Sequence, residues 1–581
     1  MKFRYWTGLA LSGTVLADTI VTSNSAIANC PPLGAVLPPP KRPSSSTAVK
    51  EVLAQFETLQ KEAGALLGNA TGLSVSIASA YEDEVLGNLS YTPQLFNESG
   101  VHKVDGNTVF RIASVSKVMT VLGLLMLGDK ISFSDPVTKY VPELQKLYKD
   151  PQNRVTAVNW DAVSLDALAS QLSGVPDALG NDLANDPSLQ LTQYGLPELK
   201  SNESSQCGDL PDQRGCTWDD FWNDMGNRAP IYAPYTTPAY GNLAYDILGL
   251  VIERVSGQSY GDYVQKQIFE PLNMTRTFVT TPDNSIGFIS KESNWWATDF
   301  GIDQADGGLY SSANDLAKFG QGILNNKLID DVKTRAWLKP HSHTSSLGIS
   351  VGSPWEIART NNLTVDGRII DVYSKIGSVP DYNSIFMVIP DYGLTVSILS
   401  AGPQSNVGIQ FGLATKVLQL LVRAFEAAGK EEATVSYAGT YANKETNSTI
   451  KLGIDNQSGL VVESWVMNGR DIKETYPAIA SVSSNPPLSQ YLSIRLFPTG
   501  LQSSTSSAWR AVFDTLAPAG VPQEDEQVFI LQFACNSWET IDNVVYGYNA
   551  LDDFVFELEP RSGTVAASIT PRAFRQTLTR T

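Results

Sequence analysis

The hydrophobic pattern of this 581-residue chain changes once, at about Gly429, and that change limits the fold more than any other feature. Before it, stretches with helical spacing alternate with short apolar runs that are typical of strands. After it come six short segments separated by Asn, Gly, Pro and Asp: STIKLGID, LVVESWVM, YLSIRLF, FILQFA, NVVYGYNA and DDFVFELE. Such a succession is typical of antiparallel strands. We therefore predict an α+β domain over residues 47–430 and a smaller antiparallel all-β domain over residues 431–581.

Residues 1–17 have the pattern of a secretory signal peptide. Lys2 and Arg4 give a basic start, residues 8–16 form a short apolar run, and Ala17 ends a suitable cleavage site. The run is too short to cross a bilayer, because a spanning helix needs about 20 apolar residues. We expect a protein secreted into the secretory-pathway lumen or the extracellular space, without a membrane span. Residues 18–46, which are rich in Pro and Ser, are predicted to form a linker.

The four cysteines suit an oxidising compartment. Cys207 and Cys216 lie close together in a polar loop, and we predict that they form a disulfide. Cys30 and Cys535 would then be able to join the N-terminal segment to the C-terminal region, or to remain as two buried thiols. No CxxC motif or Cys/His cluster occurs in the sequence, so no metal site is expected.

Eight Asn-x-Ser/Thr sequons are candidate glycosylation sites in a secreted protein. They lie at Asn69, Asn88, Asn97, Asn202, Asn273, Asn362, Asn447 and Asn456. The net charge of −18 argues against a nucleic-acid partner, because a phosphate backbone would be repelled. No cofactor is expected, and the sequence leaves the oligomeric state open.

The segment FRIASVSKVMTVLGLL (residues 110–125) places a serine and a lysine three residues apart at the start of an apolar helix. Residues three apart share one face of a helix, so Ser114 and Lys117 are expected to project together. A serine hydroxyl becomes a good nucleophile only when a base takes its proton. Burial lowers the pKa of a lysine, which would allow Lys117 to accept or relay that proton. The pair therefore predicts a nucleophile with its helper.

Two competing motifs carry less weight. Ser448 and Lys451 repeat the same spacing, but they lie in a strand pattern in which they would point to opposite faces of a sheet. The segment GISVG around Ser350 matches the GxSxG elbow of Ser-His-Asp hydrolases. That elbow needs a helix after the serine and a histidine later in the chain, whereas Pro354 follows closely and no histidine comes after Ser350. We predict a strand or turn there.

Several motifs, in family order, resemble the β-lactamase-like serine hydrolases, which include class C β-lactamases, D-alanyl peptidases, esterases and transesterases. FRIASVSK resembles the nucleophile motif, and SLDALASQLSGVPD resembles the helix and turn that follow it. YGNLAYDILGLVIERVSG resembles the second motif region, GGLYSSANDLAKF the GGL helix start, and SKIGSVPDYNSIFMVIPDYGLTVSIL the third, K-x-G motif. The resemblance covers residues 48–429 and implies the β-lactamase/transpeptidase-like fold, an antiparallel sheet flanked by helices. VGSPWEIAR and the β-rich C-terminal region resemble a secreted fungal group most.

The resemblance implies a role for each motif residue. Ser114 would be the nucleophile and Lys117 its helper. Tyr240 would be the general base, held as a phenolate or near it by the ammonium groups of Lys117 and Lys375. Asn242 would orient Lys117 and the substrate. These five residues are the predicted catalytic set.

The third motif would supply the oxyanion hole and part of the substrate site. The backbone N–H groups of Ser114 and Ser378 would bind the oxyanion, and Gly377 would let a substrate approach closely. Ile376 stands where β-lactamases usually carry Thr, whose hydroxyl helps to hold the carboxylate of a β-lactam. Ile offers no such donor, which weakens the antibiotic interpretation.

An insertion of about fifty residues between Pro176 and Tyr240 is the second departure from the family pattern. It contains the predicted disulfide together with Trp218, Phe221 and Trp222, which suggests a pinned aromatic loop over the cleft that sets the acyl pocket; the alternative is a surface decoration.

We expect a serine hydrolase or transesterase that acts on a small-molecule acyl ester or thioester through an acyl-Ser114 intermediate. The alternatives are a β-lactamase or peptidase that acts on lactams or amides, and an inactive binding or scaffold protein that retains the fold.

Overall fold

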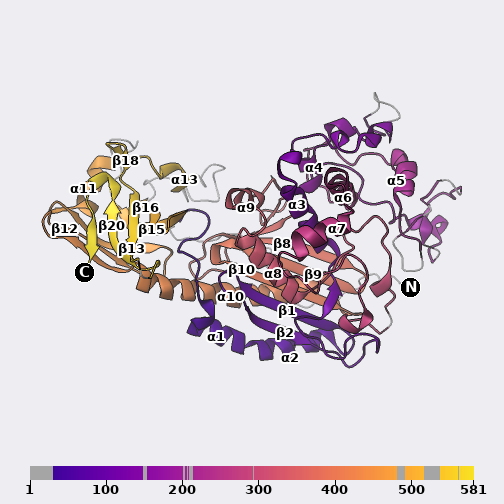
Figure 1. Ribbon diagram of the computed structural model, residues 1–581, viewed down its shortest axis with the longest axis horizontal. Coiled ribbons are helices and arrows are strands. Elements are labelled where there is room, and N and C mark those ends of the chain that lie inside the picture. Colours follow the sequence, from indigo (N-terminus) through magenta and orange to yellow (C-terminus); the bar gives the residue numbers. More distant parts are fainter. Residues whose placement is uncertain are drawn as a thin grey trace. The chain divides into compact units, whose positions relative to one another are not determined.

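The computed structural model describes residues 31–147, 154–186, 188–200, 203–205, 207–208, 213–291, 293–480, 491–515, 537–560 and 562–581. The chain forms two compact units (Figure 1). The larger comprises residues 40–364 and 369–425, and the smaller comprises the described part of residues 1–39 together with residues 365–368 and 426–581. The predicted signal peptide, the segment FILQFA, Cys30, Cys535 and Asn202 lie outside the described residues.

An antiparallel sheet organises the larger unit, with strand order β2-β1-β10-β9-β8-β7-β6-β5. Its strands are β1 (Gly72–Ser79), β2 (Val85–Tyr91), β5 (Ser342–His343), β6 (Ile349–Val351), β7 (Glu356–Thr360), β8 (Ile370–Val379), β9 (Tyr382–Ile389) and β10 (Leu394–Ala401). A separate pair joins β3 (Val109–Arg111) to β4 (Tyr310–Ser312). Strands β1, β9 and β10 are buried along their whole length, which explains their continuous apolar and Ser/Thr character.

The helices of this unit are α1 (Thr47–Ala54), α2 (Phe56–Leu67), α3 (Ser116–Met126), α4 (Leu165–Ala169), α5 (Trp218–Asp224), α6 (Leu243–Ser256), α7 (Tyr260–Val264), α8 (Ala313–Leu324) and α9 (Asp331–Trp337), followed by the N-terminal part of α10 (Val407–Ser436). Helix α8 lies across β1, β9 and β10, and α2 runs beside β2 (Figure 1).

The two faces of the large sheet carry different helices. On one face the Phe319 ring of α8 lies 5.4 Å from the Phe386 ring of β9, whose strand partner is Ser397. Side chains alternate between faces along a strand, so Ser400 points to the opposite face. There the Ser400 hydroxyl accepts a hydrogen bond from Gln410 of α10 at 3.0 Å. The sheet is thus covered on both sides, as the continuous burial of its central strands requires.

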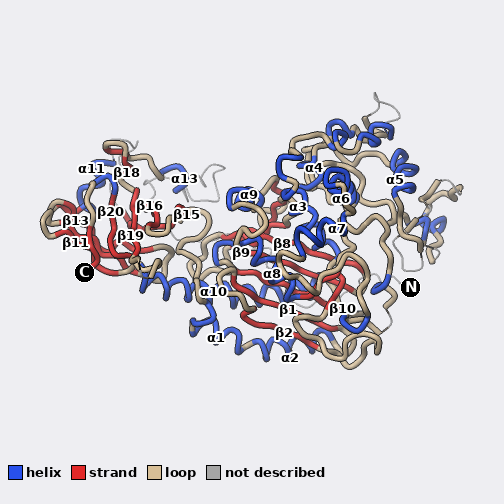
Figure 2. The backbone as a smooth tube through the Cα atoms, viewed as in Figure 1, coloured by secondary structure: helices blue, strands red, loops and turns tan. Residues whose placement is uncertain are grey.

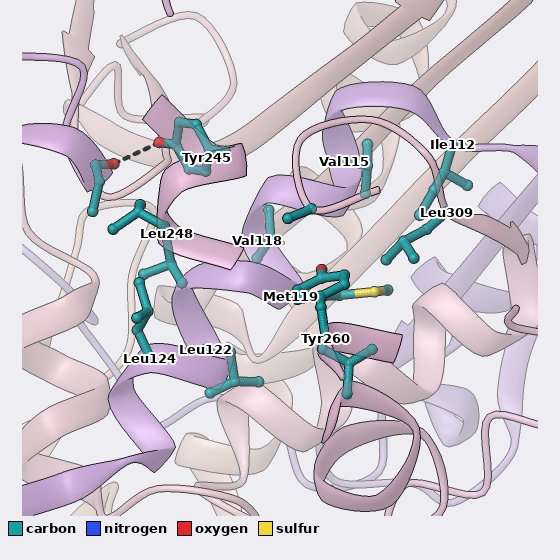
Figure 3. Packing of buried hydrophobic residues seen from close by; sticks show 14 of the residues in the cluster. Ile112, Val115, Val118, Met119, Leu122, Leu124, Tyr245, Leu248, Tyr260 and Leu309 are labelled. Atoms are coloured by element: carbon teal, nitrogen blue, oxygen red, sulfur yellow. Dashed lines mark hydrogen bonds between the residues drawn. The ribbon is translucent and has the colours of Figure 1, made fainter. Parts of the chain in front are cut away.

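Helix α3 is buried among other helices, as its all-round apolar sequence predicts. Side chains of α3, α6 and α7 pack together in one cluster (Figure 3), with Val118, Met119 and Leu122 from α3. Tyr245 of α6 sits in the same cluster, and its hydroxyl donates to the carbonyl of Ala169 at 2.6 Å, which satisfies a polar group in an apolar setting. This packing fixes the position of the helix that carries the predicted nucleophile.

Helix α10 is longer than the sequence pattern suggests. The sequence pattern predicts a helix that begins near Val407 and stops at Gly429, but the helix continues to Ser436, because Ala428 and Ala433 on its later turns are also buried. Among the described residues, α10 is also the one helix that is long and apolar enough to cross a bilayer, judged by length and composition alone. Its side chains instead contact protein: Gln410 donates to the Asn383 carbonyl of β9 at 2.7 Å, and Lys416 pairs with Glu62 of α2 at 3.0 Å.

The smaller unit is a closed antiparallel β-barrel (Figure 2). Its strands run in the order β12-β11-β21-β20-β19-β16-β15-β13, and the pairing of β12 with β13 closes the ring. They are β11 (Gly439–Asn443), β12 (Ser448–Gly453), β13 (Leu460–Met467), β15 (Tyr491–Gln502), β16 (Ser506–Thr515), β19 (Asp553–Leu558), β20 (Ala566–Pro571) and β21 (Leu578–Arg580), with the short β14 (Arg470–Asp471) attached to β13. Helices α11 (Ile472–Ala480) and α13 (Ser537–Thr540) and the β17–β18 hairpin (Val545–Tyr546, Asn549–Ala550) complete the unit.

Part of the predicted linker belongs to the core of the smaller unit. Val36 is buried with Phe497 and Val512, and Leu37 is buried in the main apolar cluster of the barrel. Both side chains are 7% exposed, whereas Leu33 nearby is 60% exposed. The linker prediction is therefore wrong at these two residues. The Pro-rich composition of the segment favoured a linker, although these two apolar side chains pack into the core.

Candidate active site

The backbone around Ser114 differs from the expected strand-to-helix junction in one detail. Strand β3 is followed by a 3₁₀ turn over Ala113–Val115, and the α-helix itself begins at Ser116. Ala113 adopts a φ of 44°, a left-handed conformation that is uncommon for a residue other than glycine. Such conformations are costly and gather at functional sites. The turn leaves Ser114 half-buried.

Gly377 is required by the packing of the protein around it. A Cβ atom there would lie 2.2 Å from the Ile112 carbonyl oxygen, 2.4 Å from the Ser384 hydroxyl and 3.0 Å from the Ser114 nitrogen. The protein's own backbone and the Ser384 hydroxyl therefore approach Gly377 closely; the approach of a substrate stays a prediction. Because Gly377 has no side chain, β8 passes close to the turn that carries Ser114. The next residue on β8, Ser378, is exposed. The oxyanion pair of Ser114 and Ser378 stays a prediction.

Lys117 is fully buried, and its ammonium group is held by three neighbours. It donates to Ser114 Oγ at 3.1 Å, to Asn242 Oδ1 at 2.7 Å and to the Asp306 carbonyl at 2.8 Å. It also lies 3.4 Å from the Asp306 carboxylate. A buried charge persists only when it is paired and hydrogen-bonded, and this one is.

The predicted lowering of the Lys117 pKa is wrong. Burial by itself would lower the pKa, but the nearby Tyr240 and Asp306 outweigh burial and raise it above the ordinary lysine value. These neighbours favour the charged ammonium form of Lys117. The predicted burial of Lys117 was correct, and Tyr240 was expected beside it, but no sequence motif indicated the second acidic neighbour, Asp306.

Tyr240 lies directly against the serine. Its hydroxyl is 2.8 Å from Ser114 Oγ and donates to it when the phenol is neutral. The ammonium groups of Lys117 and Lys375 lie 5.2 and 5.1 Å from the centre of its ring. Burial tends to raise the pKa of the phenol, but Lys117, Lys375 and the hydrogen bond with Ser114 together lower it below the ordinary value. With 43% of the residue exposed, the pair is open to solvent on one side.

Two residues that the sequence analysis did not single out position the second motif. Asp177 accepts hydrogen bonds from the backbone N–H of Asn242 at 3.0 Å and from its side-chain amide at 3.1 Å, which leaves Asn242 Oδ1 for Lys117. Gln171 holds both neighbours of Tyr240: its carbonyl accepts from Ala239 at 2.9 Å, and its Oε1 accepts from Gly241 at 2.8 Å. Both lie in SLDALASQLSGVPD, but only the fold reveals their partners.

Lys375 is buried on β8 and is already paired. Its ammonium group donates to Glu356 Oε1 at 2.5 Å and to the Ile376 carbonyl at 2.8 Å. Glu356, at the start of β7, also accepts the backbone N–H of Ile376 through Oε2 at 2.9 Å. Glu356 lies in the segment VGSPWEIAR, but no sequence motif predicts that it contacts the site.

Behind Lys117 lies a cluster of acidic side chains. Oxygens of Asp246, Asp303 and Asp306 lie within 4.8 Å of one another. Burial is the main cause that raises the pKa of both Asp246 and Asp306, and in Asp246 the neighbouring Asp306 and Asp303 raise it further. Within the cluster, the Asp306 side chain pairs with the Lys117 ammonium group at 3.4 Å. The cluster therefore contacts the site through Asp306 and Lys117.

The competing serine motifs fall in strands. Ser350 lies on β6, is buried, and is 3.1 Å from Nδ1 of His343 on the neighbouring β5, so the segment forms no elbow before a helix. Ser448 is buried on β12, whereas Lys451 is exposed and pairs with Glu463 at 2.7 Å. The predicted strand at each place is confirmed.

The insertion before Tyr240 is held together from within. The predicted disulfide between Cys207 and Cys216 is formed, and both residues are buried. Phe221 is fully buried, and the half-buried rings of Trp218 and Trp222 pack against it and each other. Phe221 therefore does not line an acyl pocket, which corrects that part of the expectation; the aromatic cluster stabilises the loop itself.

The sequon asparagines within the described residues are mostly accessible. Asn69, Asn88, Asn273, Asn362, Asn447 and Asn456 are exposed, and Asn97 is half-buried. The Asn88 amide donates to the Val75 carbonyl at 3.2 Å and to Asn314 at 2.8 Å, which a glycan on that nitrogen would disturb.

Comparisons with known proteins identify the family of this chain. The Beta-lactamase family profile matches residues 64–417, and a second profile, described as a beta-lactamase-like C-terminal domain, matches residues 429–581. A "Beta-lactamase-like protein" of Arthroderma benhamiae is 29% identical over 95% of this chain and 96% of its own length. A "Probable hydrolase M10" of a Phoma species is 25% identical over 90% and 87%. A solved β-lactamase/D-alanine carboxypeptidase from Yersinia pestis covers 64% of this chain and 99% of its own, with 18% identity and a TM-score of 0.47. Because the first profile spans more than half of the sequence, the chain belongs to the beta-lactamase family.

Proposed function

We propose that this protein is a secreted serine hydrolase or transesterase that acts on acyl esters or thioesters through an acyl-Ser114 intermediate. The observation that carries the proposal is the 2.8 Å contact between the hydroxyls of Tyr240 and Ser114, beside the ammonium groups of Lys117 and Lys375. A nucleophile within hydrogen-bond reach of an activated base is the arrangement that acyl transfer needs.

The first half of the reaction forms the acyl-enzyme. The Tyr240 phenolate takes the proton of Ser114 Oγ, and Oγ attacks the carbonyl carbon of the substrate. The negative oxygen of the tetrahedral intermediate is stabilised by backbone N–H donors, a contribution of about 2.7–4 kcal/mol for each donor. The intermediate then collapses, the bond to the leaving oxygen or sulfur breaks, and the Tyr240 hydroxyl returns the proton to that atom.

The second half regenerates the serine. Tyr240, again a phenolate, takes a proton from water or from an acceptor alcohol, whose oxygen attacks the acyl carbon. The ester bond to Ser114 breaks, and Oγ recovers the proton from Tyr240. Lys117 keeps its charge in both halves and lowers the energy of the phenolate at each proton transfer.

The choice of ester or thioester rests on the third motif. Ile376 offers no hydroxyl to a substrate carboxylate, and a buried carboxylate without a donor is costly. Relatives named probable hydrolases support hydrolysis as the overall class. Secretion is supported by the signal-peptide pattern, by the disulfide and by the exposed sequons.

Active-site labelling tests the proposal. A neutral fluorophosphonate should modify the folded protein, and peptide mass spectrometry should locate the adduct on Ser114. Ser114→Ala should remove the labelling, and Ser350→Ala, which changes the competing serine, should retain it. Absence of labelling on folded parent protein would favour an inactive scaffold instead.

A further inference from the structure

The Lys375 ammonium is shielded by a carboxylate of the protein itself. Lys375 is 1% exposed, and it donates to Glu356 Oε1 at 2.5 Å and to the Ile376 carbonyl at 2.8 Å. The rest of the group faces the Tyr240 ring, 5.1 Å from its centre. An ammonium group has three protons to donate. Two are committed within β7 and β8, and the third side faces the general base.

The second oxygen of Glu356 binds the adjacent backbone donor. Glu356 Oε2 accepts the N–H of Ile376 at 2.9 Å. One carboxylate therefore bridges a lysine ammonium and a peptide N–H that lie side by side. A cation with a neighbouring N–H is the donor pair that a substrate carboxylate would bind. In this protein the carboxylate of Glu356 occupies that position.

The same contacts close the edge of β8 beside the nucleophile. Beyond Glu356, the first residue of β7, β8 continues without that partner strand from Lys375 to Val379. An exposed strand edge is where an extended peptide adds by backbone pairing. At Ile376 the N–H is used by Glu356 and the carbonyl by Lys375, so a peptide would have to displace an ion pair in order to pair there.

We propose that Glu356 is a specificity-determining residue that occupies the anion position beside Ser114 and restricts the site to compact acyl donors without a carboxylate at that point. A substrate carboxylate entering there would meet a like charge and find its donors taken. The inference rests on the proposed acyl-Ser114 chemistry for its effect on turnover, but the occupied anion position is a property of binding alone.

The turnover test uses two nitrophenyl esters of matched length, one with a butyryl and one with a succinyl group, which adds a carboxylate. Glu356→Gln should raise the ratio of kcat/KM for the succinyl ester over the butyryl ester at least tenfold, and Glu356→Ala, which also opens space, should raise it as well. Asp371→Asn is the matched control, because it removes the same charge from β8 at a carboxylate that pairs with Arg359. A ratio that stays at the parental value in both Glu356 variants would overturn the proposal.

A binding measurement separates this inference from the proposed function. In a Ser114→Ala background, calorimetry with monomethyl succinate should show at least tenfold tighter binding when Glu356 is replaced by Gln. Equal affinity with and without Glu356→Gln in folded protein, checked by circular dichroism, would overturn the proposal whether or not the parent turns over esters. Absence of fluorophosphonate labelling in the parent would instead count against the Ser114 chemistry and leave the binding result to decide the role of Glu356.

Discussion

At the scale of single residues, Ser114 and Tyr240 make the most direct prediction. Ser114→Ala and Tyr240→Phe should each abolish turnover of an activated ester, because one removes the nucleophile and the other the hydroxyl 2.8 Å away that accepts its proton. The fold should survive, since neither change leaves a large cavity. Steady-state rates and circular dichroism on both variants check this. Near-parental rates in either variant, with contamination excluded, would rule out the mechanism.

The pH dependence follows from the charges around Tyr240. Its pKa is lowered: burial opposes ionisation, but Lys117 and Lys375 outweigh it. Because the phenolate is the active form, kcat/KM should rise with pH through an apparent pKa below about 10, the ordinary tyrosine value. Lys375→Gln removes one ammonium and leaves Glu356 facing the phenol, and both changes disfavour the phenolate. The rising limb should therefore move to higher pH; a limb that stays in place would show that another group is the base.

Substrate preference should respond to Ile376. We expect the parent to hydrolyse a nitrophenyl acyl ester with a higher kcat/KM than a chromogenic cephalosporin. Ile376→Thr supplies a hydroxyl donor and should raise the cephalosporin rate relative to the ester rate on the same preparation. Faster lactam than ester turnover in the parent, or no shift in the variant, would refute this substrate argument while leaving the Ser114 mechanism intact.

The sequence predicted the residues proposed to react better than it predicted the residues that hold them in position. Ser114, Lys117, Tyr240 and Lys375 stand in motifs, whereas Gln171, Asp177 and Glu356 contact the site from residues that are 70, 65 and 20 positions away from their partners. A hydrogen bond between distant residues leaves no periodic signal. The direction of the Lys117 pKa shift was missed because Tyr240 and then Asp306 outweigh burial, and the contact with Asp306, 189 positions away, leaves no signal in the sequence.

At the scale of secondary-structure elements, the loop between Cys207 and Cys216 depends on its covalent closure. The helix that follows begins with a capping box between Thr217 and Asp220, and Arg214 also binds Asp220 at 2.7 Å. Replacing both cysteines by Ala should cost about 2–4 kcal/mol of unfolding free energy, the usual range for a short loop. Chemical denaturation measures the cost, and non-reducing peptide mapping verifies the bond. A free thiol at either position in secreted protein would show that the loop is held in another way.

Several strands of the smaller unit were predicted from their apolar segments, and others were missed. The segments at Ser448–Gly453, Leu460–Met467 and Asp553–Leu558 are strands. Strand β16, although half of its residues are apolar, and the three-residue strand β21 were not predicted, because the pairing partners that close the ring are not indicated by local hydrophobicity.

At the scale of the whole molecule, the segment at Val36 and Leu37 predicts a stabilising role for residues far from the barrel in sequence. Leu37→Asp should destabilise the smaller unit by at least about 3 kcal/mol, because it places a charge in an apolar core. Leu33→Asp is the matched control, since Leu33 is 60% exposed, and it should have little effect. The fluorescence of the buried Trp465 and Trp509 reports this transition. Equal midpoints for the two variants would contradict the assignment.

The order of strands in the barrel determines when the barrel can close during translation. All strands of the large sheet have been translated by residue 401, whereas β21 lies between β11 and β20 and is complete only at residue 580. Until then β11 and β20 each present an unpaired edge, the kind of surface on which other chains assemble. Translation that stops between β16 and β21 would release a chain with the complete large sheet and an incomplete barrel. The unpaired strand edges of that barrel would be free to pair with other chains. Premature termination late in the gene is thus expected to cause aggregation before it causes loss of the catalytic fold.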